Sequence, residues 1–152
     1  IQNDITKNYK DIIGNINAAI DWAKANGMRV AYIKHNNLSA GSRTFKPGTP
    51  GAELAADLHI VSAHIFVKTK GNALTSEGFA AFIQDNGLTE FYIAGADAVA
   101  CVKSTCYNMA RAGYTVHVLS DCVTSYDKRQ IEAMLAYYAA KGCVVQRLSD
   151  AV

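Results

Sequence analysis

Cys101 is the residue with the clearest potential for chemistry, because it follows a strand and a glycine turn and stands where a helix should begin. The surrounding segment, residues 91–102, reads FYIAGADAVACV. A thiol at a helix N-terminus faces unpaired backbone N–H groups and the positive end of the helix dipole, and both stabilise a thiolate. The same N–H groups can hold an oxyanion. Cys101 is therefore a candidate nucleophile, and the alternative is a small buried residue in an alanine-rich packing surface.

Further polar residues are expected near Cys101, because ligands in open α/β sheets bind beyond the carboxyl ends of the strands. Those ends carry His35, Lys68 and the segment 1–4. A cysteine, a lysine and an acid from the N-terminal turn would supply a nucleophile, a cation and a base. Lys70 competes with Lys68, since the two point to the same side of a strand. His35 is a possible pocket residue, and a solvated loop histidine is the alternative.

The elements that must position these residues alternate between amphipathic helices and short β-rich segments. This order predicts an α/β fold with three layers, α/β/α, around a mostly parallel, doubly wound, Rossmann-like sheet. The predicted strands are residues 28–33, 65–68, 91–94, 114–119 and 143–148. The predicted helices are residues 8–26, 76–86 (capped by Ser76), 101–112 and 127–140, with a short one at 52–58. Residues 35–52 are predicted to form a long loop that shapes the pocket.

Composition limits the classes of partner. The 152 residues are expected to form one domain, residues 1–152. Fifteen Lys and Arg balance thirteen Asp and Glu, without a basic block that would indicate nucleic acid. The apolar segments are strand-sized and no signal-peptide pattern is present, so we expect a cytoplasmic protein with no membrane partner. The four cysteines lack CxxC spacing and are expected to be reduced thiols.

Three segments together resemble the isochorismatase-like cysteine hydrolases, the superfamily that also contains nicotinamidases and N-carbamoylsarcosine amidase. The strongest is AGADAVACVKSTCYNMARAGYTVHVLSDCVTS, residues 94–125. The second is VKTKGNAL, residues 67–74, in which Leu74 takes the place usually held by phenylalanine. The third is FKPGTPGAEL, residues 45–54. The resemblance covers nearly the whole chain and identifies residues 1–152 as a single isochorismatase-like hydrolase domain.

The resemblance implies roles for particular residues. Cys101 would attack a carbonyl or similar carbon, and Lys68 would keep the site electropositive. A cis peptide bond would fall between Ala96 and Asp97, and the backbone N–H groups of Asp97 and Cys101 would hold the oxyanion. The segment KHNN, residues 34–37, matches the region in which nicotinamidases carry metal-binding histidines, but it has His35 without a second histidine nearby. We therefore expect no metal and no cofactor, and nicotinamide is not the favoured substrate.

The family's catalytic aspartate precedes a glutamine by two residues. Ile1 and Gln2 match the end of this pattern, so the aspartate would lie immediately before residue 1. The chain as given would then lack this general base, and the sheet would lack its first strand. Asp4 is expected to start a helix rather than to replace the base.

These observations favour a hydrolase that cleaves a C–N bond of a small amide through the Cys101 thiolate. Vinyl ether hydrolysis of the isochorismatase type is an alternative. A non-catalytic, flavodoxin-like domain that binds a small ligand, and a thiol sensor at Cys101, are alternatives from other classes. The expected partners are a small-molecule substrate and further copies of the chain, since oligomers are common in the family.

Overall fold

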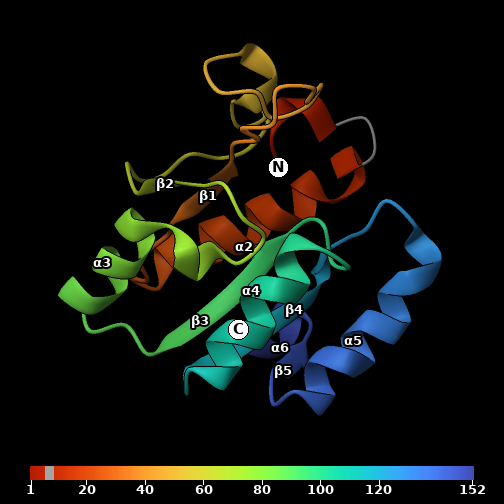
Figure 1. The fold of residues 1–152 in the computed structure, drawn as a ribbon. Coiled ribbons are helices and arrows are strands. Elements are labelled where there is room, and N and C mark those ends of the chain that lie inside the picture. The colour runs from red at the N-terminus through yellow and green to blue at the C-terminus, as the bar shows by residue number, and fades with distance from the viewer. Residues whose placement is uncertain (6–8) are drawn as a thin grey trace.

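Helices cover both faces of parallel strands in the computed structural model, which describes residues 1–5 and 9–152 (Figure 1). The strands are β1 (Tyr32–His35), β2 (Ile65–Lys68), β3 (Glu90–Gly95), β4 (Thr115–Val123) and β5 (Val144–Gln146). The α-helices are α2 (Ile13–Ala25), α3 (Glu77–Asp85), α4 (Cys101–Arg111), α5 (Ile131–Ala140) and α6 (Leu148–Ala151). Short 3-10 helices are η1 (Asn3–Ile5), η2 (Lys10–Ile12), η3 (Pro50–Ala52), η4 (Ala73–Thr75) and η5 (Lys128–Gln130). No helix in the described part of the chain has the length and hydrophobicity needed to cross a membrane.

The strands form two parallel sheets instead of the single sheet expected from the sequence. β1 pairs with β2, and β3, β4 and β5 pair in that order. Among the described residues, no strand joins β1 to β3. The two sheets nevertheless share one core, since Ile33 and Phe66 of the first pack in the same hydrophobic cluster as Phe91 and Ile93 of the second. The predicted parallel α/β architecture is therefore confirmed.

The strand side chains alternate between two hydrophobic clusters, one on each face of the sheets. In β4, Val116 and Val118 pack with α3, α4 and α5, while Leu119 packs with α2. This alternation follows from the two-residue period of a strand. Because both faces of β4 are covered, residues 115–119 of this strand are largely apolar. The helices thus form the two outer layers of the predicted three-layer arrangement (Figure 1).

Several boundaries differ from those predicted. β1 lies at Tyr32–His35 rather than 28–33, because pairing with β2 sets its register, from Tyr32 opposite Ile65 to His35 opposite Lys68. β4 runs on to Val123, and β5 is short and is followed by α6. The predicted helix over 8–26 begins at Asn8, which lies outside the described residues.

Two local predictions are wrong. No α-helix forms over residues 52–58, where the chain makes only the 3-10 turn η3, which begins at Pro50. Ser76 occupies the N-cap position of α3, but its side chain makes no capping hydrogen bond. Propensity at a single position does not determine such details, because tertiary packing overrides it.

We predict that Met109→Ala lowers the free energy of unfolding by about 2–5 kcal/mol, because removing a fully buried side chain leaves a cavity. Met109 is 0 % exposed within the cluster beneath α4. Urea denaturation followed by circular dichroism measures the change. Leu38→Ala is the control, since Leu38 is 71 % exposed and its truncation should change stability by less than about 0.5 kcal/mol. Equal effects of the two substitutions would contradict this view of the core.

Candidate active site

Cys101 is the first residue of α4, at the end of a short turn that follows β3. Gly95 ends β3 with a φ of 124°, a backbone conformation that favours glycine. The next peptide bond but one, between Ala96 and Asp97, is cis, at the position implied by the family resemblance. The thiol of Cys101 is free and partly exposed. The sequence therefore delivers the thiol to a helix N-terminus, as its pattern indicated.

Two backbone N–H groups of this turn are available to a ligand. Within the described part of the chain, neither the N–H of Asp97 nor that of Cys101 donates a hydrogen bond. The neighbouring groups are used, since Ala98 donates to the Thr124 carbonyl at 2.8 Å and Ala100 donates to the Asp97 carbonyl at 3.1 Å. Free N–H groups at a helix N-terminus are suited to developing negative charge. They are the two groups that the resemblance proposes for the oxyanion.

The side chain of Asp97 holds the turn together. Its carboxylate accepts hydrogen bonds from the N–H of Val99 at 2.8 Å, the N–H of Tyr126 at 3.1 Å and the hydroxyl of Tyr9 at 2.8 Å. Burial acts to raise the pKa of Asp97, but these bonds and one from Ser125 outweigh it and hold the pKa below its ordinary value. The carboxylate is thus charged and fully engaged with the protein.

Lys68 ends β2 and is buried, with 6 % of its surface exposed. Its Nζ lies 3.4 Å from Cys101 Sγ, 2.9 Å from His35 Nδ1 and 3.0 Å from the Lys70 carbonyl oxygen. An ammonium has three N–H donors, so three acceptors satisfy it completely. Lys70 contributes only its backbone here and is itself exposed. The structure therefore brings Lys68, rather than Lys70, to the thiol.

His35 is held against Lys68 from its backbone and from its ring. Gln2 accepts from the His35 N–H at 2.8 Å and donates to the His35 carbonyl at 2.9 Å. The ring of Phe45 meets the imidazole edge to face, with centroids 5.7 Å apart. Burial, and then the charge of Lys68, lower the pKa of His35, so its imidazole is neutral near pH 7. Gln2, which the sequence showed only as part of a motif, is thus a structural clamp.

Tyr9 belongs to the site, although nothing in the sequence indicated it. Its side chain is buried and its hydroxyl donates to Asp97. Burial, the hydrogen bond to Asp97 and the charges of Asp97 and Cys101 raise the pKa of Tyr9. The amine of Lys128 lies 5.7 Å from the centre of the Tyr9 ring. Tyr9 sits in a helical segment that the sequence presents as ordinary helix surface, so only the tertiary structure places it beside the turn.

The other three cysteines are buried and do not resemble Cys101. A hydrogen bond with Cys143, together with burial, raises the pKa of Cys106. Burial, with the nearby charge of Asp121, raises the pKa of Cys122 to about 12. Cys106 and Cys122 therefore stay protonated near neutral pH, whereas the same hydrogen bond with Cys106 lowers the pKa of the buried Cys143. Cys101 is the only partly exposed thiol among the described residues.

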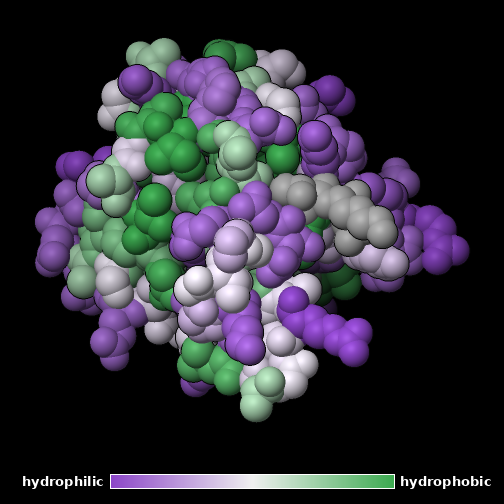
Figure 2. Space-filling model, turned by 90° about the horizontal axis from the view of Figure 1, so that it is seen from above, coloured by the Kyte–Doolittle hydropathy of each residue, from purple (hydrophilic) through white to green (hydrophobic). Residues whose placement is uncertain are grey.

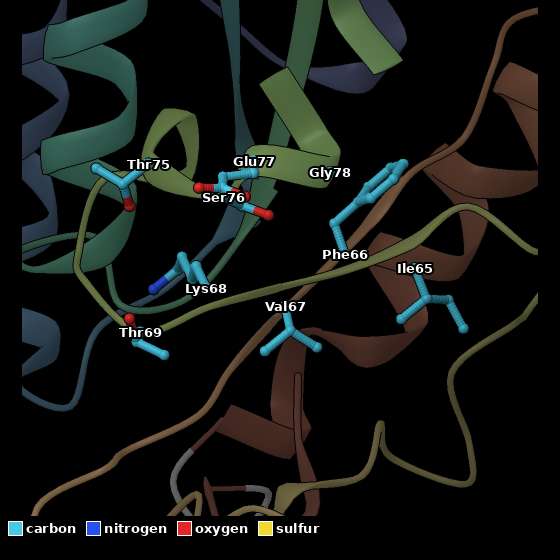
Figure 3. Close-up of a pocket in the computed structure, with 9 residues that line it drawn as sticks. All are labelled: Ile65, Phe66, Val67, Lys68, Thr69, Thr75, Ser76, Glu77 and Gly78. Atoms are coloured by element: carbon cyan, nitrogen blue, oxygen red, sulfur yellow. The ribbon is translucent and has the colours of Figure 1, made fainter. Parts of the chain in front are cut away.

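An open groove of about 540 Å³ lies beside the site, along β2 and the beginning of α3 (Figure 3). Its polar lining includes Thr69, Ser76 and Glu77, and Lys68 stands at one end. Phe66 points to the side of Gly78, whereas Ile65 and Val67 point to the other side of the strand (Figure 3). Lys68 belongs both to this groove and to the contact with Cys101, but His35 and Cys101 do not line the groove.

The segment between β1 and β2, and β2 itself, carry exposed hydrophobic residues. Figure 2, which views the molecule from above, shows hydrophobic residues gathered left of centre, with hydrophilic residues around them. The large exposed aliphatic side chains of this part of the chain are Leu38 and Ile60 in the segment, and Ile65 and Val67 in β2. Within the described residues, no three His, Cys, Asp or Glu side chains come together as metal ligands.

The chain is similar to known proteins in sequence and in fold. The family model of the isochorismatase domain matches residues 1–150. A protein of Arabidopsis thaliana named "probable inactive nicotinamidase" is 26 % identical over 137 residues, which cover 78 % of this chain and 70 % of the relative.

Solved structures have the same fold. An isochorismatase family protein from Desulfovibrio vulgaris matches with a TM-score of 0.85 and 20 % identity, covering 93 % of this chain and 82 % of its own. A nicotinamidase from Bacillus subtilis matches with a TM-score of 0.85 and 18 % identity, covering 96 % of this chain and 94 % of its own.

We predict that Asp97→Asn destabilises the protein near neutral pH and that the effect fades in acid. One carboxylate oxygen accepts from Tyr9 and Tyr126 and the other accepts from Val99, so the amide NH2 of asparagine, which replaces one of these oxygens, leaves at least one backbone N–H without its acceptor. Because the folded-state pKa of Asp97 is lowered, its stabilisation is present above the unfolded value of about 3.9 and is lost as pH falls through the folded value.

The measurement is the thermal unfolding midpoint of both proteins between pH 7 and pH 2.5. The difference should be several degrees at pH 7 and should shrink below about pH 4. Asp85→Asn, at an exposed position near the end of α3, is the matched control and should show no such difference. A constant difference at every pH would contradict the role given to the Asp97 charge.

Proposed function

Because the chain belongs to the isochorismatase family of hydrolases, we propose that it cleaves a C–N bond of a small amide with Cys101 as the nucleophile. The observation that carries this proposal is the 3.4 Å contact between Lys68 Nζ and Cys101 Sγ at the N-terminus of α4. A buried ammonium beside a thiol favours the thiolate, which is the reactive form. The nicotinamidase among the structural neighbours supports an amide rather than a vinyl ether.

The proposed reaction has two steps. The thiolate attacks the amide carbonyl carbon, and the negative charge that develops on the carbonyl oxygen is held by the N–H groups of Asp97 and Cys101. The C–N bond then breaks, and the nitrogen leaves as ammonia or an amine after it gains a proton, which leaves a thioester on Cys101. Water gives up one proton as it adds to the thioester, the C–S bond breaks, the carboxylic acid leaves and the Cys101 thiolate forms again; this proton replaces the one given to the leaving nitrogen.

The proton transfers of these steps require an acid and a base. Asp97 does not offer a free carboxylate for this purpose, because hydrogen bonds from Val99, Tyr126, Tyr9 and Ser125 already occupy it. The aspartate that the family resemblance implies as the general base stays a prediction. Lys68 keeps its three N–H groups on fixed acceptors, so its proposed role is electrostatic.

A second candidate is a non-catalytic domain that binds a small ligand at the same place. The name of the Arabidopsis relative, which describes a nicotinamidase as inactive, favours this alternative. It predicts a site that binds small molecules without turnover.

Assembly of several copies and a cytoplasmic location also stay predictions, as does the extent of the domain.

We predict that two substitutions lower kcat/KM for amide hydrolysis. Cys101→Ser should lower it by at least about 10³-fold, and Lys68→Met by about 10²–10³-fold. The serine hydroxyl is a much weaker nucleophile than a thiolate, and methionine keeps the length of Lys68 without its charge. The assay is release of ammonia from a panel of small primary amides and ureido compounds.

Lys70→Met is the matched control for Lys68→Met, because Lys70 is exposed and contributes only its carbonyl to the site. It should keep the activity of the parent protein within about twofold. A kcat/KM of Cys101→Ser close to that of the parent protein would exclude Cys101 as the nucleophile. Ligand binding without turnover on any member of the panel would favour the non-catalytic domain.

A further inference from the structure

We propose that His35 is a positioning residue, whose imidazole Nδ1 accepts a hydrogen bond from Lys68 and thereby aims the ammonium at Cys101 Sγ. Its part in turnover rests on the function proposed above. Its effect on the thiol does not, and can be tested without a substrate.

The number of acceptors around Lys68 equals the number of hydrogen bonds that its ammonium can donate. The ammonium can donate three hydrogen bonds and accept none, so each of its three neighbours must offer a lone pair. His35 Nδ1 at 2.9 Å is the nearest, followed by the Lys70 carbonyl at 3.0 Å and Cys101 Sγ at 3.4 Å. The imidazole is therefore neutral and carries its proton on Nε2.

The imidazole acceptor is held in place more firmly than the ammonium. His35 lies directly opposite Lys68 in the parallel pairing of β1 with β2. Gln2 fixes the His35 backbone on both its N–H and its carbonyl, and Phe45 packs against the ring. The lysine side chain has four rotatable bonds and needs such a fixed acceptor to keep one direction. The imidazole supplies it.

The charge that faces His35 comes from Lys68. Lys68 of β2 faces the imidazole directly, and Cys101 of α4 lies on the far side of that ammonium. Gln2 and Phe45, which contact His35 from the other segments, carry no charge. Protonation of Nδ1 would turn the acceptor into a donor and place two positive groups side by side. Because the pKa of His35 is lowered, chiefly by burial, this occurs only on the acidic side of its ordinary value of about 6.5.

The test compares His35→Asn with His35→Ala. In asparagine, Oδ1 stands the same number of bonds from Cβ as Nδ1 does in histidine, so this variant keeps an acceptor for Lys68 that cannot be protonated in this range. Alanine removes the acceptor. The readout is the rate at which iodoacetamide alkylates Cys101, resolved by mass spectrometry from the three buried cysteines, between pH 5 and pH 9.

We expect His35→Ala to slow alkylation of Cys101 about tenfold at pH 7, and His35→Asn to stay within about threefold of the parent protein. As pH is lowered below about 6.5, the rate of the parent protein should fall relative to that of His35→Asn. His59→Ala is the histidine control, because the His59 ring pairs with Asp21 at the surface, and it should change nothing. Thermal unfolding midpoints show whether each variant is folded.

Equal alkylation of the parent protein and folded His35→Ala would overturn the proposal. So would a folded His35→Asn that is as slow as His35→Ala, or one whose rate follows the parent protein in acid. If His35→Ala does not fold, the comparison of His35→Asn with the parent protein across pH decides alone. Failure of the hydrolase function looks different, because the order of alkylation rates would hold while no amide is cleaved.

Discussion

The buried charge of Lys68 is the constraint on which the site depends. A charged ammonium is stable away from water only where its N–H donors find acceptors. Leaving one of these donors without an acceptor destabilises the fold by roughly several kcal/mol. The protein meets this demand with His35 from β1, the carbonyl of Lys70 after β2 and Cys101 from α4. Three segments that are distant in sequence must therefore converge on one nitrogen atom, and this convergence fixes the end of β1 against the start of α4.

A second charge, on Asp97, fixes the turn that carries the thiol. Its carboxylate joins the turn itself, through Val99, to Tyr9 near the N-terminus and to Tyr126 after β4. The two charges have different partners, since Lys68 contacts the thiol and Asp97 accepts hydrogen bonds from Val99, Tyr9 and Tyr126. As a result, the N–H groups of Asp97 and Cys101 stay free among the described residues, while the rest of the turn is bonded. A turn built in this way can receive negative charge without rearranging, which is the condition for electrostatic stabilisation.

The family relationship and the geometry address different questions. The domain match assigns a class of hydrolase, and the likeness to solved structures at about 20 % identity shows the fold alone. The contact between Lys68 and Cys101 is a property of this chain and supports a reactive thiol. One relative is named a probable inactive nicotinamidase, so membership of the family does not by itself establish turnover, and activity must be found by assay.

The sequence by itself determined the order of helices and strands, the two-sided apolar strands and the cysteine at the start of α4. These depend on local periodicity and turn chemistry, which are written in consecutive residues. The division of the strands into two sheets, the register of β1 and the absence of a Ser76 cap depended on pairing and packing between distant segments. The resemblance implied Lys68 rather than Lys70, and only the tertiary structure brought the Lys68 amine to the thiol and placed Tyr9 beside the turn. Such choices follow from where a buried charge or hydroxyl finds its partner, and that partner lies far away along the chain.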